Sequence, residues 1–258
     1  MIPILMLHHV AGGPLEPPPL HPDSYLPRAE LARHLDALAA AGYRTLTLAD
    51  AARAGGEPAG RSVVLTFDDG CRCFAEHALP ELLARGMTAT VFAVSGELGG
   101  ENSWDREAGE RCERLMSADE LREIAGQGIE LGSHGRKHLD LTACSPEELE
   151  DDAAGSRRDL EAALGAPVLT FSYPYGRWNE RARAAVRAAG YEAAVTIEGH
   201  GPAGVREDLL SLPRSFLTPG ESRFELLLKA SGRYRFWKRL PRLGVLAALR
   251  RPASGGAR

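Results

Sequence analysis

Two adjacent carboxylates, Asp68 and Asp69, are the residues of this sequence whose chemistry most needs an explanation. They end the apolar run 63–67, and Gly70 follows them. Two like charges at the tip of a buried strand repel each other and lose their hydration. A bound cation offsets both penalties, so the pair predicts a metal site at this strand end.

Two histidines at ligand spacing form a second candidate segment. His134 and His138 follow the apolar run 129–132, and they face the same way if the segment turns helically. Two imidazoles and one carboxylate make a common metal site that keeps one position open. The sequence therefore predicts that both histidines and one of the two aspartates bind the same ion.

The elements that must position these residues are strands and helices in alternation. Most apolar runs are continuous, as expected of parallel strands that are covered on both faces. The predicted strands are residues 2–7, 43–46, 62–67, 88–94, 129–132, 168–172 and 192–197. Six or seven β-α units in one domain predict a parallel barrel or a doubly wound sheet.

Helix ends are also legible between these strands. Pro27 can open a helix that runs to residue 41. Ser117 and Ser145 each precede a glutamate by three residues, which is the spacing of a capping box. A further helix is expected over residues 179–189, before a glycine.

The candidate residues share one place in this pattern. His8 and His9, the aspartate pair, His134 and the segment 173–176 all follow predicted strands. In a parallel barrel and in a doubly wound sheet, active residues gather at the carboxyl ends of the strands. The sequence therefore predicts one shared pocket.

Composition bounds the class of protein. The chain has 258 residues, 44% of them hydrophobic and 26% charged, which suits one large α/β core. A net charge of -4 argues against general attraction to nucleic acid. The first residues lack the basic segment and cleavage site of a signal peptide, so we expect a cytoplasmic protein with free thiols. None of the four cysteines forms a Cys-x-x-Cys pair, so a zinc ribbon is not expected.

The C-terminal segment differs in charge from the rest of the chain. From Leu226 onwards it holds nine Lys or Arg and no acid. We expect a barrel domain over residues 1–225 and a basic helix and tail over residues 226–258. The tail is either a solvated helix with a frayed end or a surface for peripheral contact with anionic membrane lipid. No oligomeric state is predicted.

Three segments resemble a known family. Thr66-Phe67-Asp68-Asp69-Gly70 resembles the first signature of the polysaccharide deacetylases, the NodB-homology group or carbohydrate esterase family 4. The segment 134–138 resembles their second signature, and the segment 171–176 is similar to the third, whose usual form is Arg-x-Pro-Tyr. The order of the signatures matches, and the resemblance covers about residues 1–217.

The resemblance implies a fold, a reaction and a set of roles. The fold would be α/β, a distorted (β/α)7-type parallel barrel. The activity would be metal-dependent removal of acetyl groups from an N-acetylated sugar or glycan by activated water. A divalent metal, commonly zinc, would bind Asp69, His134 and His138, and Asp68 would be the general base. The backbone N–H of Tyr175 would help to hold the oxyanion.

The proton donor departs from the commonest family pattern. The region 210–214 lacks the late Leu-x-His motif. The start of the chain instead resembles a branch that includes the poly-N-acetylglucosamine deacetylases, in which an early histidine is the acid. That residue would be His8. If the strand continues, His9 points to the opposite side, so only one of the two should reach the pocket.

Other departures concern the substrate side. Ser172 stands where the third signature has the arginine that orients the base, and Arg214 is a candidate substitute. Gly135 replaces the usual Ser or Thr. Trp104 or Trp178 could supply a face for sugar stacking, or could simply pack. The residues predicted to bind substrate are Pro174, Tyr175, Trp178 and Arg214.

Two alternatives remain open at this stage. A site of two histidines and one carboxylate also suits a non-haem iron enzyme, but those enzymes usually have all-β barrels and do not need Asp68. A sugar-binding protein of the same fold that has lost catalysis is the other alternative. Ser172 and the missing late histidine leave it open, because function depends on the site and not on the fold.

Overall fold

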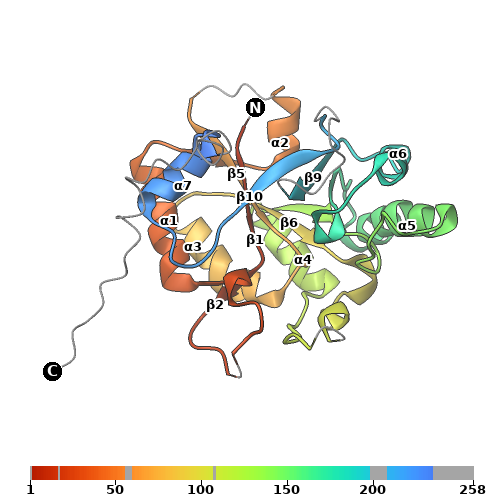
Figure 1. The fold of residues 1–258 in the computed structure, drawn as a ribbon, viewed down its shortest axis with the longest axis horizontal. Helices are drawn as coiled ribbons and strands as arrows, with labels where there is room; N and C mark the ends of the chain where they lie inside the picture. The colour runs from red at the N-terminus through yellow and green to blue at the C-terminus, as the bar shows by residue number, and fades with distance from the viewer. Residues whose placement is uncertain (1, 17, 56–59, 107–108, 198–207, 235–258) are drawn as a thin grey trace, which may run out of the picture.

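The computed structural model describes residues 2–16, 18–55, 60–106, 109–197 and 208–234. Seven parallel strands close into a barrel in the order β1-β10-β9-β8-β7-β6-β5, and β5 pairs back to β1 (Figure 1). Their bounds are β1 Ile4–Leu7, β5 Ser62–Phe67, β6 Thr90–Ala93, β7 Glu130–Ser133, β8 Thr170–Ser172, β9 Ala193–Ile197 and β10 Leu212–Phe216. The predicted seven-stranded α/β barrel is confirmed.

One strand of the closed ring was not predicted. β10 pairs with β1 on one side and β9 on the other, although Pro213 interrupts its apolar pattern and proline is unusual in a central strand. The predicted strand at 43–46 is present as β4 (Arg44–Leu46), which pairs only with the first half of β5 and lies outside the ring. β2 (His9–Ala11) and β3 (Tyr25–Pro27) form a separate parallel pair.

Helices cover the outside of the barrel. Figure 1 shows α1, α3 and α7 on one side, with α5 and α6 on the opposite side. The α-helices are α1 Arg28–Ala40, α2 Leu48–Arg53, α3 Leu79–Leu83, α4 Ala118–Gly126, α5 Pro146–Leu164, α6 Glu180–Ala188 and α7 Arg223–Ala230. A π-helical turn, Phe74–Ala78, precedes α3, and 3-10 turns occupy Pro22–Ser24, Ser95–Glu97, Ser103–Asp105 and Pro174–Gly176. The capping boxes predicted at Ser117 and Ser145 are confirmed.

The packing of the core leaves space for a site at the carboxyl ends of the strands. Alternate strand residues point inward, and Val64, Phe92 and Val195 pack in one inner cluster with Leu48 of α2. The Leu48 N–H donates to the Thr90 hydroxyl at 2.9 Å, which ties α2 to the strands. This arrangement fills the inner core with apolar side chains below the carboxyl ends of the strands, where the predicted site residues lie.

The C-terminal prediction is only partly covered by the described residues. α7 spans the predicted boundary at residue 225, and Leu226 and Ala230 are buried in the main core. Residues 235–258 lie outside the described part, so the basic tail stays a prediction. Among the described residues, no helix has the length and apolar character needed to cross a membrane.

Candidate active site

The aspartate pair follows β5 directly and is buried. Asp68 is 3% exposed and Asp69 is 4% exposed. Asp69 has a φ of 70°, and it shares this left-handed conformation with His138 and Tyr175, the other non-glycine residues of the described chain with positive φ. Such backbone strain gathers at functional sites because the surrounding fold must enforce it.

Asp69, His134 and His138 lie close together, as predicted. Asp69 Oδ1 is 3.4 Å from His134 Nε2 and 3.6 Å from His138 Nε2. One ligand atom from each residue lies within 4.8 Å of the others. The histidines do not meet through a helical turn, because the chain after β7 bends at Arg136 and Lys137 and forms no helix. Gly135 and His138 bring them together through left-handed backbone instead.

The three residues fit a divalent cation. His134 Nδ1 lies 2.8 Å from the carbonyl oxygen of Ser172. A proton on Nδ1 satisfies that contact and leaves the Nε2 lone pair facing Asp69. Asp69 Oδ1 is buried and has no hydrogen-bond partner among the described residues. Burial lowers the pKa of His138 to about 3, so its imidazole is neutral, as ligation requires.

Asp152 of α5 holds the segment that carries both histidines, and the sequence analysis missed it. Its Oδ1 accepts the N–H groups of Arg136 and Lys137, both at 2.9 Å. A Cβ on Gly135 would lie 2.3 Å from Asp152 Oδ2. Glycine is therefore required here, and the usual Ser or Thr would displace the supporting carboxylate.

Arg214 binds Asp68 and does not contact the cavity. Its Nη1 and Nη2 donate to Asp68 Oδ1 and Oδ2 at 2.6 and 2.7 Å, and Nη2 donates to the Ser172 hydroxyl at 3.0 Å. Arg214 is 1% exposed inside the barrel. Arg214 is not among the residues that line the cavity, so the structure does not support its predicted direct contact with substrate there. Its position instead agrees with the suggestion that it substitutes for the arginine missing at Ser172.

Burial and charge act in opposite directions on Asp68. Burial alone would raise the pKa of its carboxyl. The positive charge of Arg214 and the hydrogen bonds that it donates oppose burial, and the pKa of Asp68 lies well below its usual range. Asp68 is therefore ionised at neutral pH.

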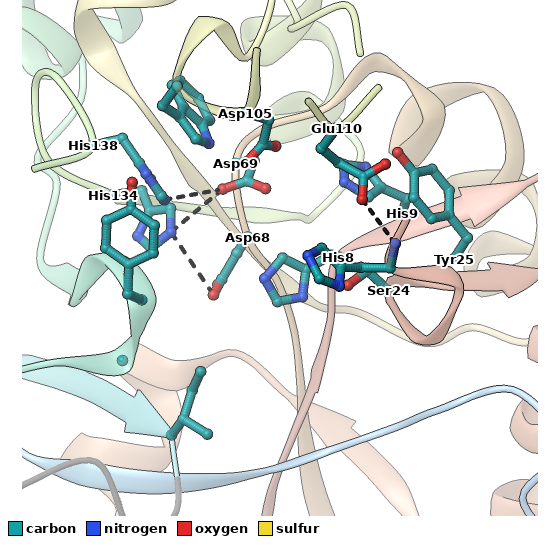
Figure 2. A pocket seen from close by; sticks show the side chains of 15 residues that line it. His8, His9, Ser24, Tyr25, Asp68, Asp69, Asp105, Glu110, His134 and His138 are labelled. Atoms are coloured by element: carbon teal, nitrogen blue, oxygen red, sulfur yellow. Dashed lines mark hydrogen bonds and ion pairs between the residues drawn. The ribbon is translucent and has the colours of Figure 1, made fainter. Parts of the chain in front are cut away.

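His8 and His9 both line the cavity, so the prediction that only one would reach it is wrong. A cavity of about 140 Å³ opens at the carboxyl ends of the strands. Its lining consists of His8, His9, His21, Ser24, Tyr25, Asp68, Asp69, Trp104, Asp105, Glu110, His134, His138, Tyr175, Gly176 and Ile197. Figure 2 shows the aspartate pair between His134 and His138 on one side and His8 and His9 on the other.

The two early histidines differ in their surroundings. His8 follows β1, and its ring meets Phe216 edge to face at 5.3 Å. Burial lowers the pKa of His8, and the charges of Asp69 and Asp68 offset this only in part. His9 belongs to β2 and stacks on Tyr25 at 4.5 Å. The chain therefore does not continue as one straight strand past residue 7, which is why both side chains reach the cavity.

The aromatic residues divide differently from the prediction. Trp178 is 7% exposed and packs in the core on Tyr173, with ring centroids 6.4 Å apart. It does not line the cavity, and neither does Pro174, so both substrate-binding predictions fail for direct contact. Trp104 lines the cavity and stacks on His138 at 4.4 Å, and Tyr175 meets the same ring edge to face at 4.6 Å.

Asp105 is a further cavity carboxyl that the sequence analysis did not single out. Asn102 Nδ2 donates to its Oδ2 at 2.6 Å. Burial and the charge of Asp69 raise the pKa of Asp105 to about 6. The folded protein therefore binds more protons here than the unfolded chain between about pH 4 and pH 6, and stability falls as pH rises through that window.

Asp105→Asn is expected to raise the free energy of unfolding of the metal-free protein by about 1 kcal/mol at pH 8 and to leave it unchanged near pH 4. The estimate is reduced for solvent screening because Asp105 is only half-buried. Urea unfolding at both pH values measures it, with Asp119→Asn on the exposed face of α4 as the control. Equal stabilisation at both pH values would contradict the prediction.

The chain is similar in sequence to known polysaccharide deacetylases. The family model for polysaccharide deacetylases matches residues 55–194. YxkH of Bacillus subtilis is 29% identical over 224 residues, which are 86% of this chain and 73% of that protein. The poly-beta-1,6-N-acetyl-D-glucosamine N-deacetylase of Staphylococcus aureus is 26% identical over 66% of this chain, and the match spans 58% of that protein.

Solved structures share the fold. The Streptococcus pyogenes deacetylase PplD in complex with acetate superposes with a TM-score of 0.73 at 26% identity, covering 89% of this chain and 97% of that one. IcaB from Ammonifex degensii superposes with a TM-score of 0.69 at 22% identity, covering 91% and 98%. The family model covers more than half of the chain, and we conclude that the chain belongs to the polysaccharide deacetylases of the NodB type, carbohydrate esterase family 4.

Proposed function

We propose that this chain is a metal-dependent hydrolase that removes acetyl groups from an N-acetylated sugar or glycan. The observation that carries the proposal is the cluster of Asp69, His134 and His138 beside the buried Asp68. Relatives named as deacetylases of chitooligosaccharides and of poly-beta-1,6-N-acetyl-D-glucosamine support the substrate class. We propose zinc as the ion, because two imidazoles and a carboxylate suit it.

The residues divide the work in this proposal. A divalent cation bound by Asp69, His134 and His138 would lower the pKa of a water ligand and polarise the acyl oxygen. Asp68 is ionised and lies 3.9 Å from His134 Nε2 through its Oδ2, so it can accept the proton of the attacking water. Arg214 holds that carboxylate at both oxygens and so fixes its orientation. The backbone N–H of Tyr175 is the proposed second donor to the oxyanion.

His8 is the proposed acid for the leaving amine. It lies at the carboxyl end of β1, across the aspartate pair from the histidine ligands (Figure 2). Its Nδ1 is buried and has no hydrogen-bond partner among the described residues. An amine is a poor leaving group unless it is protonated, so a histidine on this side completes the reaction.

The size of the cavity suggests that most of a bound glycan would lie outside it. About 140 Å³ is well below the 300 Å³ or more of pockets that enclose whole small ligands. It suits an acetamido group, with the sugar ring at the mouth near Trp104 and Tyr175. Tyr175 is 43% exposed and can contact a sugar from that position.

Two features count against the alternatives. The parallel barrel and the paired Asp68 do not fit a non-haem iron enzyme of the all-β type. Against loss of catalysis, Arg214 is a candidate for the role of the arginine missing at Ser172, and His8 is a candidate for the role of the missing late histidine. A cytoplasmic location and contact of segment 226–258 with anionic lipid stay predictions.

Acetate release is expected from N-acetylated glucosamine oligomers, to be lost on treatment with a chelator, and to return on addition of Zn²⁺. The reason is that the ion held by Asp69, His134 and His138 would activate the attacking water, and a chelator would remove it. An enzymatic acetate assay across a panel of acetylated saccharides measures it. Full activity in the chelated, metal-free protein would contradict the proposal.

His8→Ala is expected to lower kcat for an N-acetylated substrate by about 10²-fold, but to change hydrolysis of an aryl acetate much less. The reason is that a phenolate leaves without a proton, whereas an amine does not. Steady-state kinetics on both substrates separate the acid role from damage to the site, which would lower both rates. A larger and equally selective loss in His9→Ala would transfer the role to His9.

A further inference from the structure

We propose that His9, Asp69 and Cys71 form a second cation site, for a borderline or soft divalent ion such as Zn²⁺ or Co²⁺, that shares Asp69 with the first. One ligand atom from each of the three residues lies within 4.8 Å of the others. All three are buried, with exposures of 5%, 4% and 1%. The inference rests on the proposed function, because it adds a second cation beside the one proposed for Asp69, His134 and His138.

Packing alone does not explain this cluster. A buried cysteine usually serves as a small apolar side chain, but Cys71 lies beside a carboxylate and an imidazole. His9 and Cys71 each share a side-chain hydrogen bond with Cys73, but His9 Nδ1 is buried without a hydrogen-bond partner among the described residues. Buried polar atoms are nearly always paired, and an exception calls for an explanation such as an ion.

The local backbone holds the three ligands in place. Asp69 and Cys71 are separated by Gly70, whose φ of 71° continues the turn after β5. Cys71 forms an isolated antiparallel bridge with Leu115. The His9 ring is fixed by stacking on Tyr25, with an angle of 22° between the planes. The ligands therefore come from two segments that backbone pairing and ring stacking hold in place, as a metal site requires.

The chemistry of the donors selects the ion. Thiolate and imidazole together favour zinc, cobalt or copper over magnesium or calcium. Cys71 must lose its proton to bind, so loading releases one proton to solvent and leaves a sulfur–metal bond. In Figure 2 Asp69 lies between the ligand histidines and His9, where a carboxylate can serve both sites. The cavity reaches His9 and Asp69, which gives an ion a path to the site.

Cobalt is the probe that separates the two sites. The chelated full chain is loaded with Co²⁺ without oxygen and desalted, and both cobalt content and thiolate-to-cobalt absorption are measured. The wild type is expected to hold about two ions per chain with the absorption band. Cys71→Ser should hold about one ion without the band, while the matched Cys112→Ser variant, outside the cluster, should behave as the wild type.

The double variant His134→Ala with His138→Ala tests independence from the proposed function. It should lose the first ion and keep the band, because the thiolate site retains its own ligands. In Cys71→Ser, the ion that remains is the one that the double variant loses. Its presence shows that the region around the site is still folded in Cys71→Ser. A wild type without the band, or a band unchanged by Cys71→Ser, would overturn the second site and leave the proposed deacetylase site standing.

Discussion

If Asp68 is the proposed general base, Asp68→Asn is expected to lower kcat/KM for acetate release by about 10³-fold and to leave the metal content unchanged. The amide cannot accept the proton of the attacking water, and general bases contribute about 10²–10⁴-fold to rates. Asp69, His134 and His138 are untouched, so metal content should not change. Acetate release and elemental analysis on the same samples test both halves of the prediction.

A control is needed because Asp68→Asn leaves Arg214 buried and charged, which could lower activity by destabilising the fold. Arg214 is fully buried, and without Asp68 its charge loses its bidentate partner. The double variant Asp68→Asn with Arg214→Met removes both charges, so it should fold better than Asp68→Asn while remaining as inactive. A double variant that regains near-wild-type activity would show that lost stability, and not the lost base, caused the defect.

Arg214→Met is expected to lower the free energy of unfolding by about 3–5 kcal/mol at pH 7. The substitution leaves Asp68 charged, buried and without its main partner, and the Asp68 hydrogen bond from Ser172, at 3.4 Å, is too long to replace it. Adding Asp68→Asn should recover most of the loss, because a neutral pair needs no partner. Urea unfolding of the four members of this double-mutant cycle measures the coupling.

The pH dependence of the same cycle follows from the sign of the shift. The pKa of Asp68 is lowered in the folded protein, so its pairing with Arg214 stabilises the fold above the unfolded value of about 4. That stabilisation is lost as pH falls below about 4 towards the folded pKa. The difference between wild type and Arg214→Met should therefore shrink in acid, and a difference that does not change with pH would contradict the assignment.

Much of the barrel followed from local patterns. The strand carrying the aspartate pair is a continuous apolar run with buried residues on both faces, which periodicity alone identifies. The capping boxes at Ser117 and Ser145 are also local, since both partners lie within one helical turn. β10 was missed because Pro213 and Arg214 break its apolar pattern, and only closure of the ring makes it a central strand.

The site divides in the same way. The sequence by itself was enough to predict that Asp68, Asp69, His134 and His138 belong to one site. Their residue types and spacing are typical of metal ligands and a base, and this pattern can be read without knowing any distant contact. Only the tertiary structure decided that Arg214 holds Asp68, across 146 positions of sequence, and that Trp104 rather than Trp178 faces the cavity. Those contacts depend on how strands close into a barrel and how loops pack over it, and neither leaves a periodic signal in the chain.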